Sequence, residues 1–283
     1  MKLSNKVAGS MGSYLHYLDL GWEPVLKGIA SAGFKNVELS ASDEWQSHIT
    51  VEEIKPADIE RLKELLAKYD LTPISMSAHC DLTTEEGLAA FKRRLDFARE
   101  FNIKILITGT GPWRDDRTLD KLYENVQEVS RYAEKDEALI TLETHGSGFT
   151  GESHTATGKM YLPIIKHINL PNVRVCYDTA NVIFYEGVRP EEDIQYIAEH
   201  LGYLHVKENT DSPLGFGGCP ALGQGLINFP KIFEVFRKVN YSGPFSVEIE
   251  MQAPSRFSHL DISEVNAAHV ESYRFLQQYF ELG

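Results

Sequence analysis

Residues 139–145 read LITLETH, residues 173–179 read VRVCYDT, residues 203–209 read YLHVKEN and residues 244–250 read PFSVEIE. Each stretch is a short run of apolar, β-branched and aromatic residues that ends in polar residues able to bind a metal or transfer a proton. This pattern is typical of a buried strand that opens into an active site. Segments with helical periodicity lie between the stretches, so we expect parallel strands joined by right-handed crossovers.

The same alternation runs through the N-terminal half of the chain. In the stretch Pro56–Tyr69, Ile59, Leu62 and Leu65 fall on one helical face while charged residues surround the other. The other expected strands are Lys6–Gly12, Asn36–Ser40, Pro73–His79 and Lys104–Thr110. The other expected helices are Thr84–Phe101, Thr118–Lys135, Gly158–Ile168, Pro190–Leu201, Phe229–Val239 and Ser263–Phe280, with Thr84 and Ser263 as N-caps and Pro190 and Pro230 in first turns.

Eight strand–helix repeats favour one (β/α)₈ TIM barrel that takes up residues 1–283 as a single domain. An open, doubly wound sheet is the alternative. Polar residues end most of the strands, and a barrel gathers such ends into one ring, whereas an open sheet spreads them along an edge. The glycine-rich stretch Asp211–Ile227 is expected to be an active-site loop.

The composition narrows the classes of partner. There are 41 acidic and 28 basic residues, for a net charge of −13, which disfavours nucleic acid and anionic membranes. The three cysteines form no CxxC pair, and no apolar run resembles a signal peptide or a membrane span. We therefore expect a cytoplasmic protein with a small-molecule substrate and no nucleic-acid or membrane partner. A homodimer or homotetramer is left open.

Four strand ends carry side chains that bind divalent metals: Glu143, Asp178, His205 and Glu248. A charged group at the end of a buried strand is costly unless it is paired, hydrogen-bonded or bound to a metal. The four follow one another by about one βα unit each, so a barrel would aim them into one mouth. Three carboxylates and an imidazole suit Mn²⁺, Mg²⁺, Co²⁺ or Zn²⁺. We expect one divalent ion per chain, with Mn²⁺ the first choice.

Together with GFKNVELS at 33–40 and the stretch 223–250, these segments resemble the sugar phosphate isomerase/epimerase family. These are xylose-isomerase-like barrels that include ketose 3-epimerases and hydroxypyruvate isomerase. In that family a Glu, an Asp, a His and a second Glu on strands five to eight hold the metal. The resemblance implies a metal-dependent isomerase or epimerase of a sugar or keto-sugar. Glu143 and Glu248 would then exchange protons beside a carbonyl, through an enediolate that the metal stabilises.

The chain also departs from the family pattern. Asn181 stands where many sugar epimerases of the family have histidine, and Asp211 where they have arginine. Those groups grip substrate hydroxyls or phosphate, so a lyase, a keto-inositol dehydratase or a 3-keto-glycoside deglycosidase with the same metal site is an alternative. Endonuclease IV, a metal-dependent phosphodiesterase, shares the barrel but resembles a site with several more ligands. Only His79 and Glu38 are candidates for those, and the acidic balance disfavours phosphodiesters.

Six further residues are candidates to contact a small carbohydrate-like substrate, and each also has a structural interpretation. In the structural interpretation, the histidines line the wall of the mouth as hydrogen-bond partners only, and the lysine pairs with Glu250. The glutamate is then a buried ion-pair partner, and the tryptophan lies in a surface loop. The candidates are His79, His145, Lys207, Asn181, Glu38 and Trp113.

Overall fold

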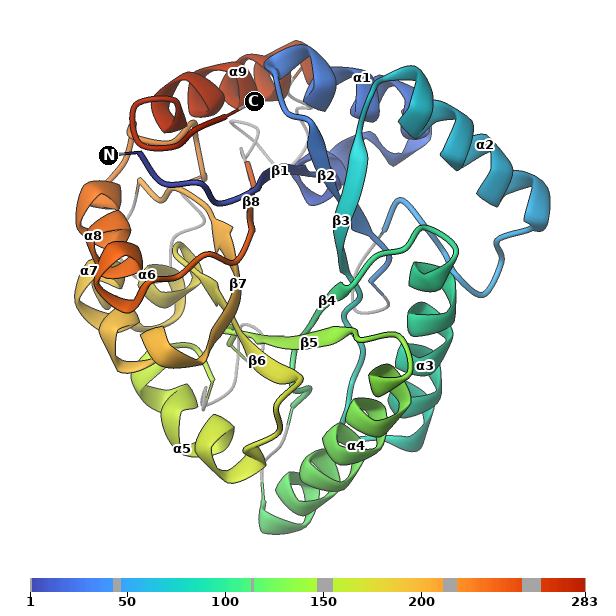
Figure 1. Cartoon of the computed structure of the whole chain (residues 1–283), viewed down its shortest axis with the longest axis vertical. Coiled ribbons are helices and arrows are strands. Elements are labelled where there is room, and N and C mark those ends of the chain that lie inside the picture. The colour runs from blue at the N-terminus through green and yellow to red at the C-terminus, as the bar shows by residue number, and fades with distance from the viewer. Residues whose placement is uncertain are drawn as a thin grey trace.

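The computed structural model describes residues 2–42, 47–112, 115–146, 155–210, 218–250 and 261–282. Eight parallel strands close into a barrel in chain order, and helices surround it (Figure 1). Because β1 pairs with β8, the (β/α)₈ prediction is confirmed and the open-sheet alternative is wrong. The strands are β1 Val7–Ser10, β2 Asn36–Ser40, β3 Thr72–Ser77, β4 Ile105–Thr108, β5 Leu139–Glu143, β6 Val173–Asp178, β7 Leu201–Val206 and β8 Phe245–Val247.

The helices confirm most of the sequence prediction. The main ones are α1 Trp22–Ala32, α2 Pro56–Lys68, α3 Glu85–Arg99, α4 Asp116–Glu134, α5 Gly158–Ile168, α6 Asn181–Glu186, α7 Pro190–Asp193, α8 Phe229–Val239 and α9 Ile262–Leu276, and the 3₁₀ helices are η1 Met11–Leu20, η3 Ile194–Tyr196 and η4 Ala198–His200.

Some details of the predicted helices are confirmed and others are wrong. Thr84 caps α3 as expected, because its hydroxyl accepts the Gly87 N–H. Ser263 is not an N-cap: Asp261 is, and its carboxylate accepts the Ser263 N–H at 2.9 Å. The continuous helix expected over Pro190–Leu201 is also wrong, since that stretch is one turn of α-helix followed by two 3₁₀ turns.

No helix in the described part of the chain combines the length and the apolar character needed to cross a membrane.

The registers of the C-terminal strands determine which polar side chains of the candidate site lie next to one another. Asp178 on β6 lies beside His205 on β7, and Glu143 on β5 lies beside Cys176 on β6. Because side chains alternate along a strand, residues two apart on β6 and β7 point into the barrel one above the other. Cys176 and Tyr203 fill the interior below the charged residues, together with Ile107. The barrel is therefore closed by a packed layer under the mouth.

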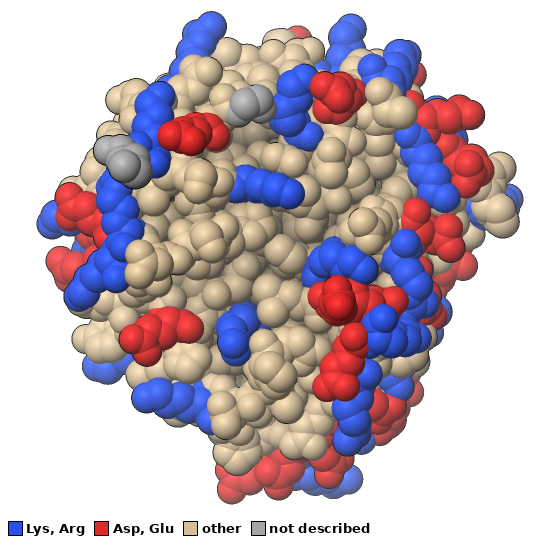
Figure 2. All heavy atoms as spheres, viewed as in Figure 1, with Lys and Arg blue, Asp and Glu red and all other residues tan. Residues whose placement is uncertain are grey.

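The outer surface in Figure 2 carries both signs of charge. Lys and Arg alternate with Asp and Glu around the periphery, over the helices, and no single-sign patch covers this face. Exposed ion pairs such as Lys35–Asp70, at 2.7 Å, contribute to this mixture. Such a face offers no extended basic track of the kind that nucleic acid needs.

Candidate functional site

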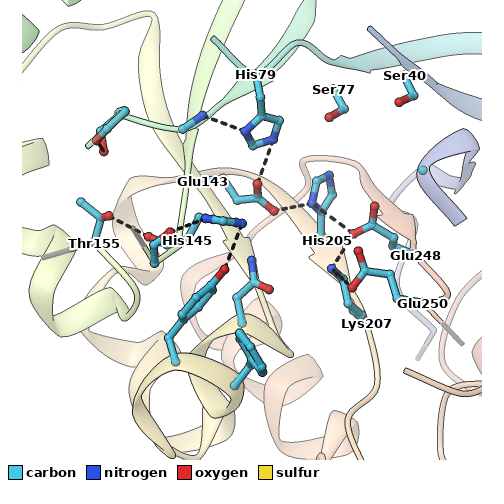
Figure 3. Close-up of a pocket in the computed structure, with 18 of the residues that line it drawn as sticks. Ser40, Ser77, His79, Glu143, His145, Thr155, His205, Lys207, Glu248 and Glu250 are labelled. Carbon is cyan, nitrogen blue, oxygen red and sulfur yellow. Dashed lines mark hydrogen bonds and ion pairs between the residues drawn. The ribbon is translucent and has the colours of Figure 1, made fainter. Parts of the chain in front are cut away.

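A cavity of about 710 Å³ lies at the C-terminal ends of the strands. Its wall includes most of the residues that the sequence singled out, and Figure 3 shows several of them pointing toward one another. Asp178 and Glu38 are fully buried and do not line it. Trp113 lies outside the described residues. The predicted residues that line the cavity are His79, Glu143, His145, Asn181, His205, Lys207 and Glu248.

His205 is the centre of the charged cluster. Its Nδ1 lies 2.6 Å from Glu143 Oε1, 3.7 Å from Glu248 Oε2 and 3.9 Å from Asp178 Oδ2. One ligand atom each from Asp178, His205 and Glu248 falls within 4.8 Å of the others. Ligands around one ion have about this spacing when each metal–ligand bond is roughly 2.0–2.6 Å long. Asp178, His205 and Glu248 thus lie within reach of one cation, and Glu143 contacts the same nitrogen of His205.

Asp178 tests whether a cation fits. Its Oδ1 accepts the backbone N–H groups of Ala180 and Asn181, at 2.8 and 2.9 Å. Its Oδ2 is buried and has no hydrogen-bond partner, although the ammonium of Lys207 lies 3.1 Å away. Because Oδ2 accepts no hydrogen bond and lies in an oxygen-rich group with His205 and Glu248, the residues present fit a divalent ion.

Lys207 is enclosed by carboxylates. Its Nζ lies 2.8 Å from Glu248 Oε2 and 3.1 Å from both Asp178 Oδ2 and Glu250 Oε2. Burial opposes a charged lysine, but the three carboxylates outweigh it and raise the pKa of Lys207 well above its usual value. The lysine pairs with Glu250 and also lines the cavity, so its contact with a substrate stays a prediction.

His79 orients Glu143. The Gly109 N–H donates to His79 Nδ1 at 3.1 Å, which leaves the ring proton on Nε2, 2.9 Å from Glu143 Oε2. Glu143 is therefore held on one oxygen by His79 and on the other by His205. Burial opposes ionisation of Glu143, but the charges and hydrogen bonds of these two histidines keep its pKa well below the usual range. The carboxylate is held ionised and fixed in direction.

His145 forms a second polar group on the wall. Its Nδ1 lies 2.6 Å from the carbonyl oxygen of Gly146, so Nδ1 carries the proton and Nε2 accepts from the Tyr185 hydroxyl at 3.2 Å. The sequence did not single out Tyr185, because it belongs to α6 and not to a strand end. The sequence feature that could have indicated Tyr185 is its position four residues after Asn181, a predicted site residue. Asn181 itself is anchored to the end of β5, because its side-chain amide donates to Thr144 O at 3.1 Å.

Cys176 was also not a candidate from the sequence. Its thiol lies with Glu143 and His205 in a second group of ligand-type atoms within 4.8 Å of one another. This group shares two members with the oxygen-rich cluster above it. Among the described residues both candidate ligand groups include His205.

The chain is similar to several known sugar epimerases. The chain is 22% identical over 245 residues to the L-ribulose 3-epimerase of Methylomonas sp. (strain DH-1), covering 81% of this chain and 78% of the relative. It is 20% identical over 260 residues to the L-ribulose-5-phosphate 3-epimerase of Shigella flexneri serotype 5b (strain 8401), covering 84% and 86%. A crystal structure of D-psicose 3-epimerase in the presence of D-fructose superposes with a TM-score of 0.75, 16% identity and coverage of 97% and 99%.

A family model described as xylose isomerase-like TIM barrel matches residues 26–279, which is most of the chain and all strands from β2 to β8. The closed eight-stranded barrel has the architecture that this description names. The chain belongs to the xylose isomerase-like TIM barrel family.

Proposed function

We propose that this chain is a divalent-metal-dependent epimerase or isomerase of a small sugar or keto-sugar. The observation that carries the proposal is the placement of two carboxylates, Glu143 and Glu248, around one imidazole at the cavity wall. Two glutamates on the same small cavity give one group to remove a proton and a second to return it. The two similar relatives are named as sugar 3-epimerases, which supports the same class of chemistry.

In this proposal the four clustered side chains hold one ion, and Mn²⁺ is the first choice because three of the four are carboxylates. When bound, the ion supplies positive charge beside the oxygen atoms that flank the reacting carbon. Glu143, fixed by two histidines, takes the proton from the carbon next to the carbonyl. Glu248 returns a proton to the opposite face, which inverts that carbon. Asp178 and His205 hold the ion and take no proton.

The substrate we propose is an unphosphorylated sugar. The names of the two relatives differ in this respect, since one acts on L-ribulose and the other on L-ribulose-5-phosphate. Lys207 is the only lysine or arginine among the described residues that line the cavity, and three carboxylates already surround it. Phosphate esters are bound chiefly by cationic side chains, and the described part of this wall offers no arginine and no second lysine.

A lyase, dehydratase or deglycosidase that uses the same site is the second candidate. The His145–Tyr185 pair favours it, because an elimination needs a further acid for the departing oxygen, and this pair lines the same cavity. Endonuclease IV-like hydrolysis has no such support: His79 bonds to Glu143, and the described ligand groups fit one ion.

Deuterium exchange tests the proposal. The Mn²⁺-loaded protein in D₂O should place deuterium on the carbon beside the carbonyl of a free ketose and form its epimer. In Glu143→Gln, exchange should fall about 10²–10⁴-fold, because the base is lost. In Glu248→Gln, epimer should fall similarly while the first exchange persists. Bound metal is measured in each variant, and the exposed Glu234→Gln is the control.

Two results would contradict the proposal. One is a metal-loaded wild type that exchanges no deuterium into any ketose. The other is epimer formation at the wild-type rate in either glutamine variant at full metal occupancy. Loss of a leaving group without epimer would instead identify the lyase.

A further inference from the structure

Glu38 on β2 lies beneath the cavity, against the far side of the His205 ring. The carboxylate is fully buried, and its two oxygens lie 3.2 and 3.3 Å from His205 Nε2. The other ring nitrogen, Nδ1, faces Glu143, Asp178 and Glu248. His205 is therefore held between one buried carboxylate below and three carboxylates above.

Three serine hydroxyls complete the surroundings of the Glu38 carboxylate. Ser10 donates to Oε1 at 2.9 Å, and Ser75 and Ser246 donate to Oε2 at 3.3 and 3.1 Å. The serines come from β1, β3 and β8, so four strands converge on this one group. Both carboxylate oxygens thus have hydrogen-bond partners without any contact to the cavity.

We propose that Glu38 is a positioning residue that accepts the Nε2 proton of His205 and thereby directs Nδ1 to the metal. The inference rests on the proposed function in one respect, namely that His205 is a metal ligand. In the structure Nδ1 donates to Glu143, so a cation would take the place of that Nδ1 proton. The imidazole then keeps one proton, and the Glu38 carboxylate holds it on Nε2, which leaves the Nδ1 lone pair to the cation. The same hydrogen bond makes the imidazole a stronger donor to the ion.

This role differs from direct substrate contact and from a purely structural ion pair. The cavity wall does not include Glu38, so a sugar would meet His205 and not the carboxylate below it. If Glu38 were only part of a structural ion pair, its replacement would change the free energy of unfolding alone. If Glu38 positions His205, its replacement must also change the metal affinity and the position of the ring proton.

The test uses the full chain and two measurements other than turnover. The first is Mn²⁺ affinity, from the EPR signal of the free ion. The second is the ¹⁵N NMR signal of the His205 ring with diamagnetic Mg²⁺ bound. Glu38→Gln should weaken Mn²⁺ binding about 10–100-fold and move part of the ring proton from Nε2 to Nδ1. His205→Ala, which removes the ligand itself, should weaken binding at least as much.

Glu208→Gln is the matched control, because Glu208 is also fully buried but accepts backbone N–H groups of Asn209 and Gly223 and does not contact His205. It should lower the melting temperature while leaving Mn²⁺ affinity within twofold. If Glu38→Gln fails to fold, Ser246→Ala, which removes one hydroxyl donor, should still weaken Mn²⁺ binding severalfold.

The outcomes separate the inference from the proposed function. Wild-type Mn²⁺ affinity in folded Glu38→Gln, or in Ser246→Ala when Glu38→Gln does not fold, would overturn the positioning role while leaving the enzyme proposal intact. A wild-type protein that binds no divalent ion would overturn both. Weakened binding together with the shifted ring proton supports the role.

Discussion

His269 on α9 is a fully buried histidine for which neither ring nitrogen has a hydrogen-bond partner among the described residues. Its ring stacks on Tyr14 with centroids 5.4 Å apart and meets the Phe34 ring edge-on at 5.7 Å. Burial lowers the pKa of His269 from 6.5 to about 3, because the charged form would be desolvated and unpaired. The protein thus folds with this ring neutral.

We predict that His269→Phe reduces the loss of stability in acid. Between pH 6.5 and about 3 the unfolded chain binds a proton at this site that the folded chain does not. Acid therefore favours unfolding, and the histidine's contribution to stability, complete above pH 6.5, is lost as the pH falls. Urea unfolding at pH 7 and at pH 5 measures how far the free energy of unfolding falls between the two pH values. This fall should be smaller by about 2 kcal/mol in the variant than in the wild type. The exposed His16→Asn is the control, and equal drops in wild type and His269→Phe would contradict the assignment.

The individual site residues were predictable where a strand end carried them. Glu143, Asp178, His205 and Glu248 each follow apolar residues, and alternation along β7 placed Lys207 on the same side as His205. Sequence could not assign Glu38 to the underside of His205, because that contact depends on the stagger between β2 and β7 across the barrel. Tyr185 was missed because no strand pattern points to a residue in the first helical turns after β6.

At the scale of the elements, the stretch after α6 shows where periodicity misleads. Ile194, Ile197 and Ala198 are buried and have helical spacing, so the sequence favoured one helix over 190–201. In a 3₁₀ turn residues three apart lie directly above one another, and this geometry also puts Ile194 and Ile197 on one side. At the end of α7, the Asp193 carboxylate accepts the N–H groups of Gly158 and Lys159 on α5.

We predict that Asp193→Ala destabilises the barrel by about 2–4 kcal/mol. The buried carboxylate caps the start of α5 and also accepts the Tyr177 hydroxyl at 2.9 Å, so its removal leaves several buried donors without partners. The exposed Glu192→Ala, one position earlier, should change the unfolding free energy by less than about 0.5 kcal/mol. Denaturant unfolding of both variants measures the difference. A change in Asp193→Ala no larger than in Glu192→Ala would show that the cap is not required.

The whole molecule determines the electrostatics of the mouth. Among the described residues, Asp81, Glu143, Glu248 and Glu250 line the cavity and Asp178 lies under it, so this part of the mouth carries five carboxylates and one lysine. A divalent ion and the lysine together would still leave these carboxylates in excess. In the segment after β7, Gly223 and Ile227 donate their backbone N–H groups to Glu208 at 2.9 and 3.1 Å, so these two groups are not available to an anion.

Barrel closure was predictable because it needs only eight repeats and polar strand ends, whereas the charge balance of the mouth required the assembled ring. Asp81 follows β3 and Glu250 follows β8, and neither position signals an active site on its own. Both lie on the cavity wall, a few residues beyond the ends of their strands. Long-range assembly of this kind leaves no periodic trace in the sequence.

We predict that the protein prefers a free ketose to its phosphate ester by at least about tenfold in kcat/KM. Moving a phosphate dianion into a mouth of net negative charge costs a few kcal/mol at short range, and about 1.4 kcal/mol already gives tenfold. Deuterium exchange with L-ribulose and L-ribulose-5-phosphate, at equal Mn²⁺ occupancy, measures the ratio. Glu250→Gln removes one negative charge from the cavity wall and should reduce the ratio of the two kcat/KM values severalfold. The exposed Glu234→Gln should leave that ratio unchanged. A phosphate ester that reacts as well as the free sugar would contradict the charge argument without affecting the acid–base pair, since both substrates would still exchange deuterium through Glu143.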